Sequence, residues 1–156
     1  MSGPIKKITV LLVDDHPVVR KGLISCLSHR ENLKVVGEAS DGLEAITRVK
    51  ELNPDIVLMD INMPGMDGLT VTETLRKDSP QTRVLILSMH GNREYVMRIV
   101  KAGARGYVLK DAPTDELLRA IDRVLALPPE QIARDWSIRD TLVGTRRTFE
   151  HAGARL

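Results

Sequence analysis

Short apolar runs alternate with amphipathic segments along most of this chain, and this alternation limits how it can fold more than any other feature. Apolar runs bounded by turn residues are typical of strands buried on both faces of a parallel sheet. We expect strands at about residues 8–14, 33–37, 55–60, 83–88 and 106–109. Apolar residues at helical spacing predict helices at about 17–29, 42–52, 68–77, 92–102 and 114–127.

This order of elements predicts an α/β fold with a doubly wound, five-stranded parallel sheet. Right-handed crossovers should place helices on both faces of that sheet. The expected topology is the flavodoxin-like strand order 2-1-3-4-5, with its switch point between the first and third strands. The run at 33–37 is short and mixed in polarity, which suits an edge strand. Ser40 or Asp41 can cap the helix that follows it.

Composition excludes several classes of protein. Hydrophobic residues make up 42% and charged residues 28% of the 156 residues, which is ordinary for a globular domain. A net charge of +2 gives no electrostatic case for binding nucleic acid or an anionic membrane. No apolar run approaches the roughly 18 residues of a membrane span. Cys26 is the single cysteine and cannot form an internal disulfide, which is compatible with the cytoplasmic location that we expect.

Four of the predicted strands end in a polar residue or are followed directly by one. Asp14 and Asp15 follow the first strand, Asp60 ends the third, Ser88 ends the fourth and Lys110 follows the fifth. Ligands of open parallel sheets bind just beyond the carboxyl ends of the strands. A single acid at a strand end is most often a cap or turn residue, but this joint pattern predicts one crevice suited to a divalent cation and a phosphoryl group.

The acids of this crevice suit Mg²⁺, which prefers oxygen ligands and is usually held by one or two carboxylates and several waters. Asp15 and Asp60 could each supply one oxygen, and Asp14 could hold a bound water. A main-chain carbonyl in the loop after Asp60, most simply that of Asn62, could complete the protein's share.

Asp60 is then a plausible nucleophile, because aspartyl phosphates are an established form of covalent catalysis. Phosphoryl transfer needs positioning and charge stabilisation more than acid–base chemistry. The Lys110 amine could neutralise one phosphoryl oxygen, and the Ser88 hydroxyl could donate to another.

These segments resemble a known family. The motifs Asp14-Asp15-His16-Pro17 and Asp60-Ile61-Asn62-Met63-Pro64-Gly65-Met66-Asp67-Gly68, with Ser88 and Lys110, resemble the CheY-like receiver domain of two-component response regulators. The Asp-Asp-His-Pro opening and the segment 106–111 are most similar to NarL/FixJ-type transcription regulators. The resemblance covers about residues 7–127.

The resemblance implies roles for individual residues. Asp60 would accept a phosphoryl group from the phosphohistidine of a sensor histidine kinase. Asp14, Asp15 and Asp60 would form the Mg²⁺ site, and Lys110 would bind the phosphoryl group. Ser88 and Tyr107 would form a switch pair. Many receivers have proline after the lysine, in a cis peptide; here Asp111 stands there, so the geometry of that bond is left open.

The resemblance also implies a function. Such a receiver is not an enzyme in the ordinary sense, since it catalyses only its own phosphorylation and dephosphorylation. In a full regulator it controls transcription through dimerisation and a DNA-binding output domain. A stand-alone receiver that binds a partner protein through the 92–125 face is one alternative. A phosphoester hydrolase with Asp60 as turnover nucleophile is another, although no general acid follows Asp60 at close spacing.

The last residues differ from the rest. Residues 128–156 are too few for a helix-turn-helix output domain and show no recognition-helix pattern. We therefore expect a receiver domain at 1–127 and a C-terminal extension at 128–156 that is either one short helix or disordered. DNA contact is expected only through an output domain that is not recognisable here.

Overall fold

The computed structural model describes residues 6–89 and 93–126. In these ranges strands and helices alternate, and every element lies within two residues of its predicted ends. Their order is β1 (Ile8–Val13), α1 (Pro17–Leu27), β2 (Leu33–Ala39), α2 (Gly42–Leu52), β3 (Ile56–Asp60), α3 (Gly68–Asp78), β4 (Arg83–Ser88), α4 (Arg93–Ala102), β5 (Gly106–Leu109) and α5 (Thr114–Ala126). The predicted extension at 128–156 falls outside the described residues.

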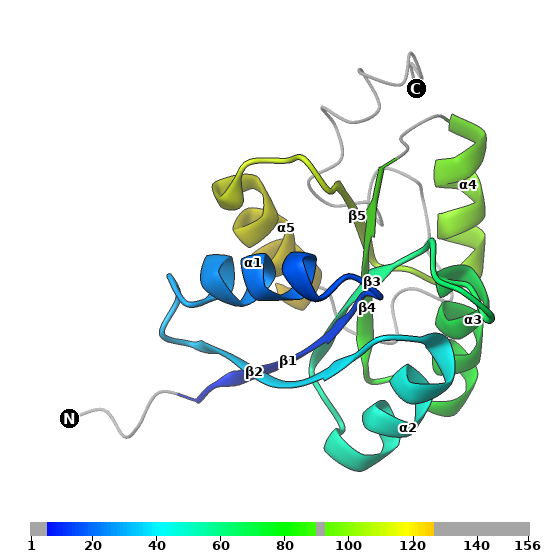
Figure 1. The fold of residues 1–156 in the computed structure, drawn as a ribbon, viewed down its shortest axis with the longest axis horizontal. Helices are drawn as coiled ribbons and strands as arrows, with labels where there is room; N and C mark the ends of the chain where they lie inside the picture. Colours follow the sequence, from blue (N-terminus) through cyan, green and yellow to red (C-terminus); the bar gives the residue numbers. More distant parts are fainter. Residues whose placement is uncertain (1–5, 90–92, 127–156) are drawn as a thin grey trace.

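The strands form one parallel sheet in the order β2-β1-β3-β4-β5, as predicted, with β2 at one edge. Helices α1 and α5 cover one face, and α2, α3 and α4 cover the other (Figure 1). Both faces of the sheet are therefore packed against helices, which confirms the doubly wound architecture. Across the described ranges, no helix combines the length and apolar character that a membrane crossing requires.

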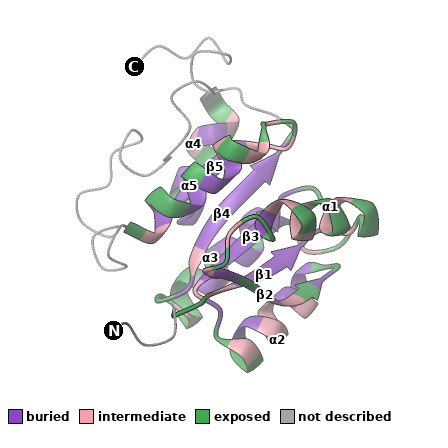
Figure 2. Ribbon diagram, turned by 90° about the vertical axis from the view of Figure 1, so that its left-hand side faces the viewer, coloured by how far each residue is buried: buried purple, intermediate pink, exposed green. Residues whose placement is uncertain are grey.

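The core is aliphatic and centres on β3, whose residues Ile56–Asp60 are all buried. Figure 2 shows the strands as the buried layer between helices with exposed outer faces. Because β3 is covered on both faces, its sequence is continuously apolar instead of alternating. The last residue of this apolar strand is an acid, Asp60, which is only 1% exposed.

The register of the strands brings their carboxyl ends together. Val13 pairs with Met59, so Asp14 and Asp60 follow directly at neighbouring positions. Ser88 pairs with Leu109, which places Lys110 one residue beyond. All four carboxyl ends, those of β1, β3, β4 and β5, thus lie on the same side of the sheet.

The helix next to the edge strand begins with a reciprocal cap. The Asp41 carboxylate accepts a hydrogen bond from the Glu44 main-chain N–H at 2.8 Å. The Glu44 carboxylate in turn accepts one from the Ser40 main-chain N–H at 2.7 Å. Of the two predicted caps the structure therefore selects Asp41.

Candidate functional site

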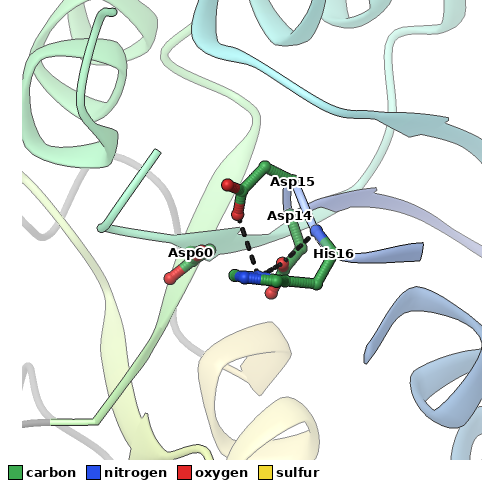
Figure 3. A group of neighbouring side chains, drawn as sticks. All are labelled: Asp14, Asp15, His16 and Asp60. Atoms are coloured by element: carbon green, nitrogen blue, oxygen red, sulfur yellow. Dashed lines mark hydrogen bonds and ion pairs between the residues drawn. The ribbon is translucent and has the colours of Figure 1, made fainter. Parts of the chain in front are cut away.

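Three carboxylates meet beyond the ends of β1 and β3. Asp14 and Asp60 are each 1% exposed, whereas the side chain of Asp15 is 25% exposed. Potential ligand atoms of Asp14, Asp15, His16 and Asp60 all lie within 4.8 Å of one another (Figure 3). The structure thus brings together the three acids predicted to bind a metal and adds His16 to them.

The Lys110 amine bridges two of these acids. Its Nζ lies 3.0 Å from Asp14 Oδ2 and 3.1 Å from Asp60 Oδ1. Burial by itself lowers the pKa of Lys110, but its hydrogen bonds to Asp14 and Asp60 outweigh that effect and raise the pKa. The amine is therefore a fixed positive charge between the two buried carboxylates. Its main-chain N–H also donates to the Ser88 carbonyl oxygen at 2.9 Å.

Within the described part of the chain, two carboxylate oxygens of the site lack a hydrogen-bond donor. Asp60 Oδ1 accepts from the Asn62 main-chain N–H at 3.3 Å, but Asp60 Oδ2 is buried and accepts no hydrogen bond. Asp15 Oδ1 is also buried without one, although it lies 3.0 Å from His16 Nδ1. Buried charged oxygens without partners are costly. A divalent cation would satisfy both, so these residues fit the predicted Mg²⁺ site.

The charge state of Asp60 reflects this environment. Burial raises the pKa of Asp60, and the nearby charge of Asp14 raises it further, while the hydrogen bond from Lys110 acts in the opposite direction. The side chain therefore holds a proton more tightly than an aspartate in water. A bound cation would favour the carboxylate form, because the cation is the largest local charge in such a site.

The first turn of α1 holds the end of β1 in place. Asp14 Oδ1 accepts from the His16 main-chain N–H at 2.8 Å and lies 2.9 Å from His16 Nδ1. Arg20, one turn into α1, donates from Nη1 to the Asp14 carbonyl oxygen and from Nε to Glu38 on β2 at 2.9 Å. Sequence reasoning missed Arg20; its position one turn after the acids was the available signal.

Gly68 is a second residue that sequence reasoning missed. It is the first residue of α3, and a Cβ at this position would lie 2.3 Å from the Asp60 carbonyl oxygen. Its N–H donates to the Ile61 carbonyl oxygen at 3.0 Å. Glycine is therefore needed because α3 begins almost in contact with the main chain of the candidate nucleophile. Asn62, in the intervening loop, has an exposed side chain.

The predicted switch pair lies on adjacent strands. Ser88 at the end of β4 and Tyr107 on β5 are both 0% exposed. Tyr95 of α4 packs against the same core cluster as Tyr107, and its side chain is hydrogen-bonded to Ser88. Burial raises the pKa of both tyrosines. The Tyr95 contact was not predicted.

The Lys110–Asp111 peptide bond, whose geometry the sequence left open, is trans.

The family model for the response regulator receiver domain matches residues 10–122. The chain belongs to the response-regulator receiver family. It is 42% identical over 118 residues to the nitrate/nitrite response regulator NarL of Escherichia coli K12, covering 76% of this chain and 55% of NarL. The chain thus spans about half the length of the curated relatives it matches. The predicted similarity to NarL/FixJ-type regulators is confirmed.

Solved structures agree with the fold. The receiver domain of NarL from Mycobacterium tuberculosis is 38% identical, with a TM-score of 0.74 over 78% of this chain and 98% of that one. CheY from Borrelia burgdorferi, in complex with CheX, BeF₃⁻ and Mg²⁺, is 30% identical, with a TM-score of 0.72 over 76% of this chain and 90% of that one. The receiver is therefore that of a two-component response regulator with a CheY-like fold.

Proposed function

We propose that this receiver accepts a phosphoryl group on Asp60 and changes conformation in response. The observation that carries this proposal is the environment of one side chain. Asp60 is buried at the end of β3, with the Lys110 amine 3.1 Å from Oδ1 and no donor to Oδ2 among residues 6–89 and 93–126. An oxygen without a donor keeps its lone pairs available for a metal ion, which leaves the other oxygen of Asp60 for attack on phosphorus.

The transfer follows from this geometry. One carboxylate oxygen of Asp60 attacks the phosphorus of a phosphohistidine, while the other remains available to the metal ion. A P–O bond forms, and the P–N bond breaks with its electron pair going to the departing imidazole. The Lys110 amine exchanges its contact with Asp60 Oδ1 for a phosphoryl oxygen. The Ser88 hydroxyl, at the end of the neighbouring strand, donates to a second phosphoryl oxygen.

The metal belongs to the same proposal. Asp15, Asp60 and the main-chain carbonyl of Asn62 would hold Mg²⁺ directly, and Asp14 would hold it through water. When bound, the ion supplies positive charge that offsets the phosphoryl oxygens and the acids. The two carboxylate oxygens without donors, on Asp15 and Asp60, support this ligand set.

The conformational response involves Ser88 and Tyr107. A phosphoryl group adds negative charge and acceptor oxygens, which would draw the Ser88 hydroxyl toward Asp60. Because Tyr95 is hydrogen-bonded to Ser88, that movement breaks a contact with α4 and frees Tyr107 to repack. The surface formed by α4 and β5 is therefore the region expected to change.

We further propose the biological setting. The receiver domain spans residues 1–127, acts in the cytoplasm and takes its phosphoryl group from a sensor histidine kinase. It catalyses only its own phosphorylation and dephosphorylation. In a full regulator it controls transcription by homodimerisation and through a DNA-binding output domain. The 42% identity to NarL, named as a nitrate/nitrite response regulator, supports this setting.

The test is incubation with a small phosphodonor and Mg²⁺, followed by intact mass measurement. We expect one phosphoryl addition to the wild-type chain and none to the Asp60→Ala variant. Asp41→Asn is the matched control, because Asn caps a helix as well as Asp and this position lies outside the site. A wild-type chain that gains no mass, or an Asp60→Ala chain that does, would contradict the proposal.

A further inference from the structure

We propose that His16 is a further metal ligand that raises the affinity of this site for transition-metal dications such as Co²⁺, Ni²⁺ or Zn²⁺ relative to its affinity for Mg²⁺. This inference rests on the proposed metal site at Asp60 and extends it to a residue of α1's N-terminal cap. The carboxylates alone would make an all-oxygen site. His16 changes the chemistry of the site because it adds a nitrogen donor.

The positions of the atoms support a shared ion. His16 Nδ1 lies 2.9 Å from Asp14 Oδ1 and 3.0 Å from Asp15 Oδ1. Neighbouring ligands about 2.1 Å from an octahedral ion stand roughly 3 Å apart. In Figure 3 dashed lines join the imidazole of His16 to the carboxylates of Asp14 and Asp15, and Asp60 lies beside this group. His16 Nδ1 and Asp15 Oδ1 therefore have the spacing of adjacent ligands around one ion, while Asp14 Oδ1 accepts the His16 main-chain N–H.

The unpartnered oxygens are a second and independent observation. The amine of Lys110 contacts one oxygen of Asp14, Oδ2, and one of Asp60, Oδ1. Asp60 Oδ2 remains buried without a hydrogen bond from any residue that the structure describes, as does Asp15 Oδ1. Hydrogen bonding within a turn explains why His16 lies near Asp14, but it does not explain these two oxygens. A cation held jointly with His16 Nδ1 would satisfy both.

The imidazole is able to ligate. Coordination through Nδ1 needs its lone pair, so the ring proton must be on Nε2. The His16 side chain is 61% exposed, which allows Nε2–H to be hydrated in that tautomer. Imidazole nitrogen suits Zn²⁺, Ni²⁺ and similar ions, whereas carboxylate, carbonyl and water ligands suit Mg²⁺. His16 should therefore strengthen binding of transition metals more than binding of Mg²⁺.

The experiment uses the untagged 156-residue chain with Co²⁺ as the probe, because its visible absorption reports the ligands. Titration with Co²⁺ and Mg²⁺ gives an affinity ratio for the wild-type chain and for His16→Gln. We expect the Co²⁺-to-Mg²⁺ ratio to fall by at least about tenfold in His16→Gln, with a shift of the absorption bands. Paramagnetic shifts of the His16 ring in the wild-type chain give a readout that needs no substitution.

His29→Gln is the matched control, because the ring of this exposed histidine lies 3.1 Å from main-chain oxygens at the end of α1 and away from the site. An unchanged ratio and spectrum in His16→Gln, or an equal loss in His29→Gln, would overturn the assignment. The Mg²⁺-supported mass gain at Asp60 is measured separately. If the wild-type chain gains the mass but His16→Gln has an unchanged Co²⁺-to-Mg²⁺ ratio and spectrum, only the assignment of His16 as a ligand is refuted. If the wild-type chain gains no mass but Co²⁺ binding depends on His16, only the phosphoacceptor role of Asp60 is refuted.

Discussion

Replacing Gly68 with alanine should destabilise the domain and impair the site, although the same change usually stabilises a helix. Alanine in a helix gains at most about 1 kcal/mol over glycine. At Gly68, however, the new Cβ would lie 2.3 Å from the Asp60 carbonyl oxygen and 2.8 Å from Ile61 Cα. Reaching an acceptable contact requires a separation of about 0.7 Å more, and overpacking of this kind costs about 1–3 kcal/mol. Both contacts are main-chain atoms, so the cost should exceed the gain.

We expect a net loss of about 2 kcal/mol, which lowers the urea midpoint by about 1 M. Since Asp60 itself must move, the rate of its phosphorylation should also fall by about tenfold or more. Gly22→Ala is the matched control: Gly22 lies inside α1, and a Cβ there meets nothing within 4 Å. That variant should be more stable than wild type by up to about 1 kcal/mol. A Gly68→Ala chain as stable and as reactive as wild type would refute the steric argument.

Three further substitutions, at two positions, test the charges of the site. Lys110→Met should slow phosphorylation of Asp60 by about 100-fold in mass-spectrometric time courses. Lys110→Arg should not restore the rate, because the planar guanidinium group does not replace the compact amine. Rates equal to wild type would refute this role. Burial raises the pKa of Asp60 above its ordinary value of 3.8. The protonated side chain therefore contributes to folding stability below pH 3.8, and this contribution is lost as the pH rises through the raised pKa. Asp60→Asn should therefore have a higher urea midpoint than wild type at pH 7, with the gap closing below pH 3.8; equal midpoints at pH 7 would contradict it.

The positions of the acids, the hydroxyl and the lysine were predictable because a parallel sheet leaves little freedom. Once β3 is read as a buried strand, Asp60 must lie at its carboxyl end, and the strand order places Asp14 beside it. The same logic places Ser88 next to the strand that carries Lys110. The fold and the set of converging residues therefore follow from apolar runs and the residues that end them.

The contacts that hold the site depend on features that a linear pattern does not contain. Arg20 reaches the Asp14 carbonyl only because α1 returns along β1 and β2 at a particular angle. The need for glycine at 68 arises from the close approach of α3 to β3 and not from its backbone angles. Tyr95 meets Ser88 because α4 packs over β4 and β5. The apolar spacing of α4 does not by itself determine how the helix is rotated about its axis on the sheet.

The main-chain hydrogen bond from Lys110 to Ser88 has a consequence for how the domain can evolve and be engineered. It joins the residue that would contact the phosphoryl group to the residue that would report its arrival, through main-chain atoms that every amino acid except proline has. Either side chain can therefore be substituted by any residue that keeps the main-chain N–H of residue 110, and this hydrogen bond is retained. A proline at 110 would remove the donor and separate the two functions, whatever side chains surround it.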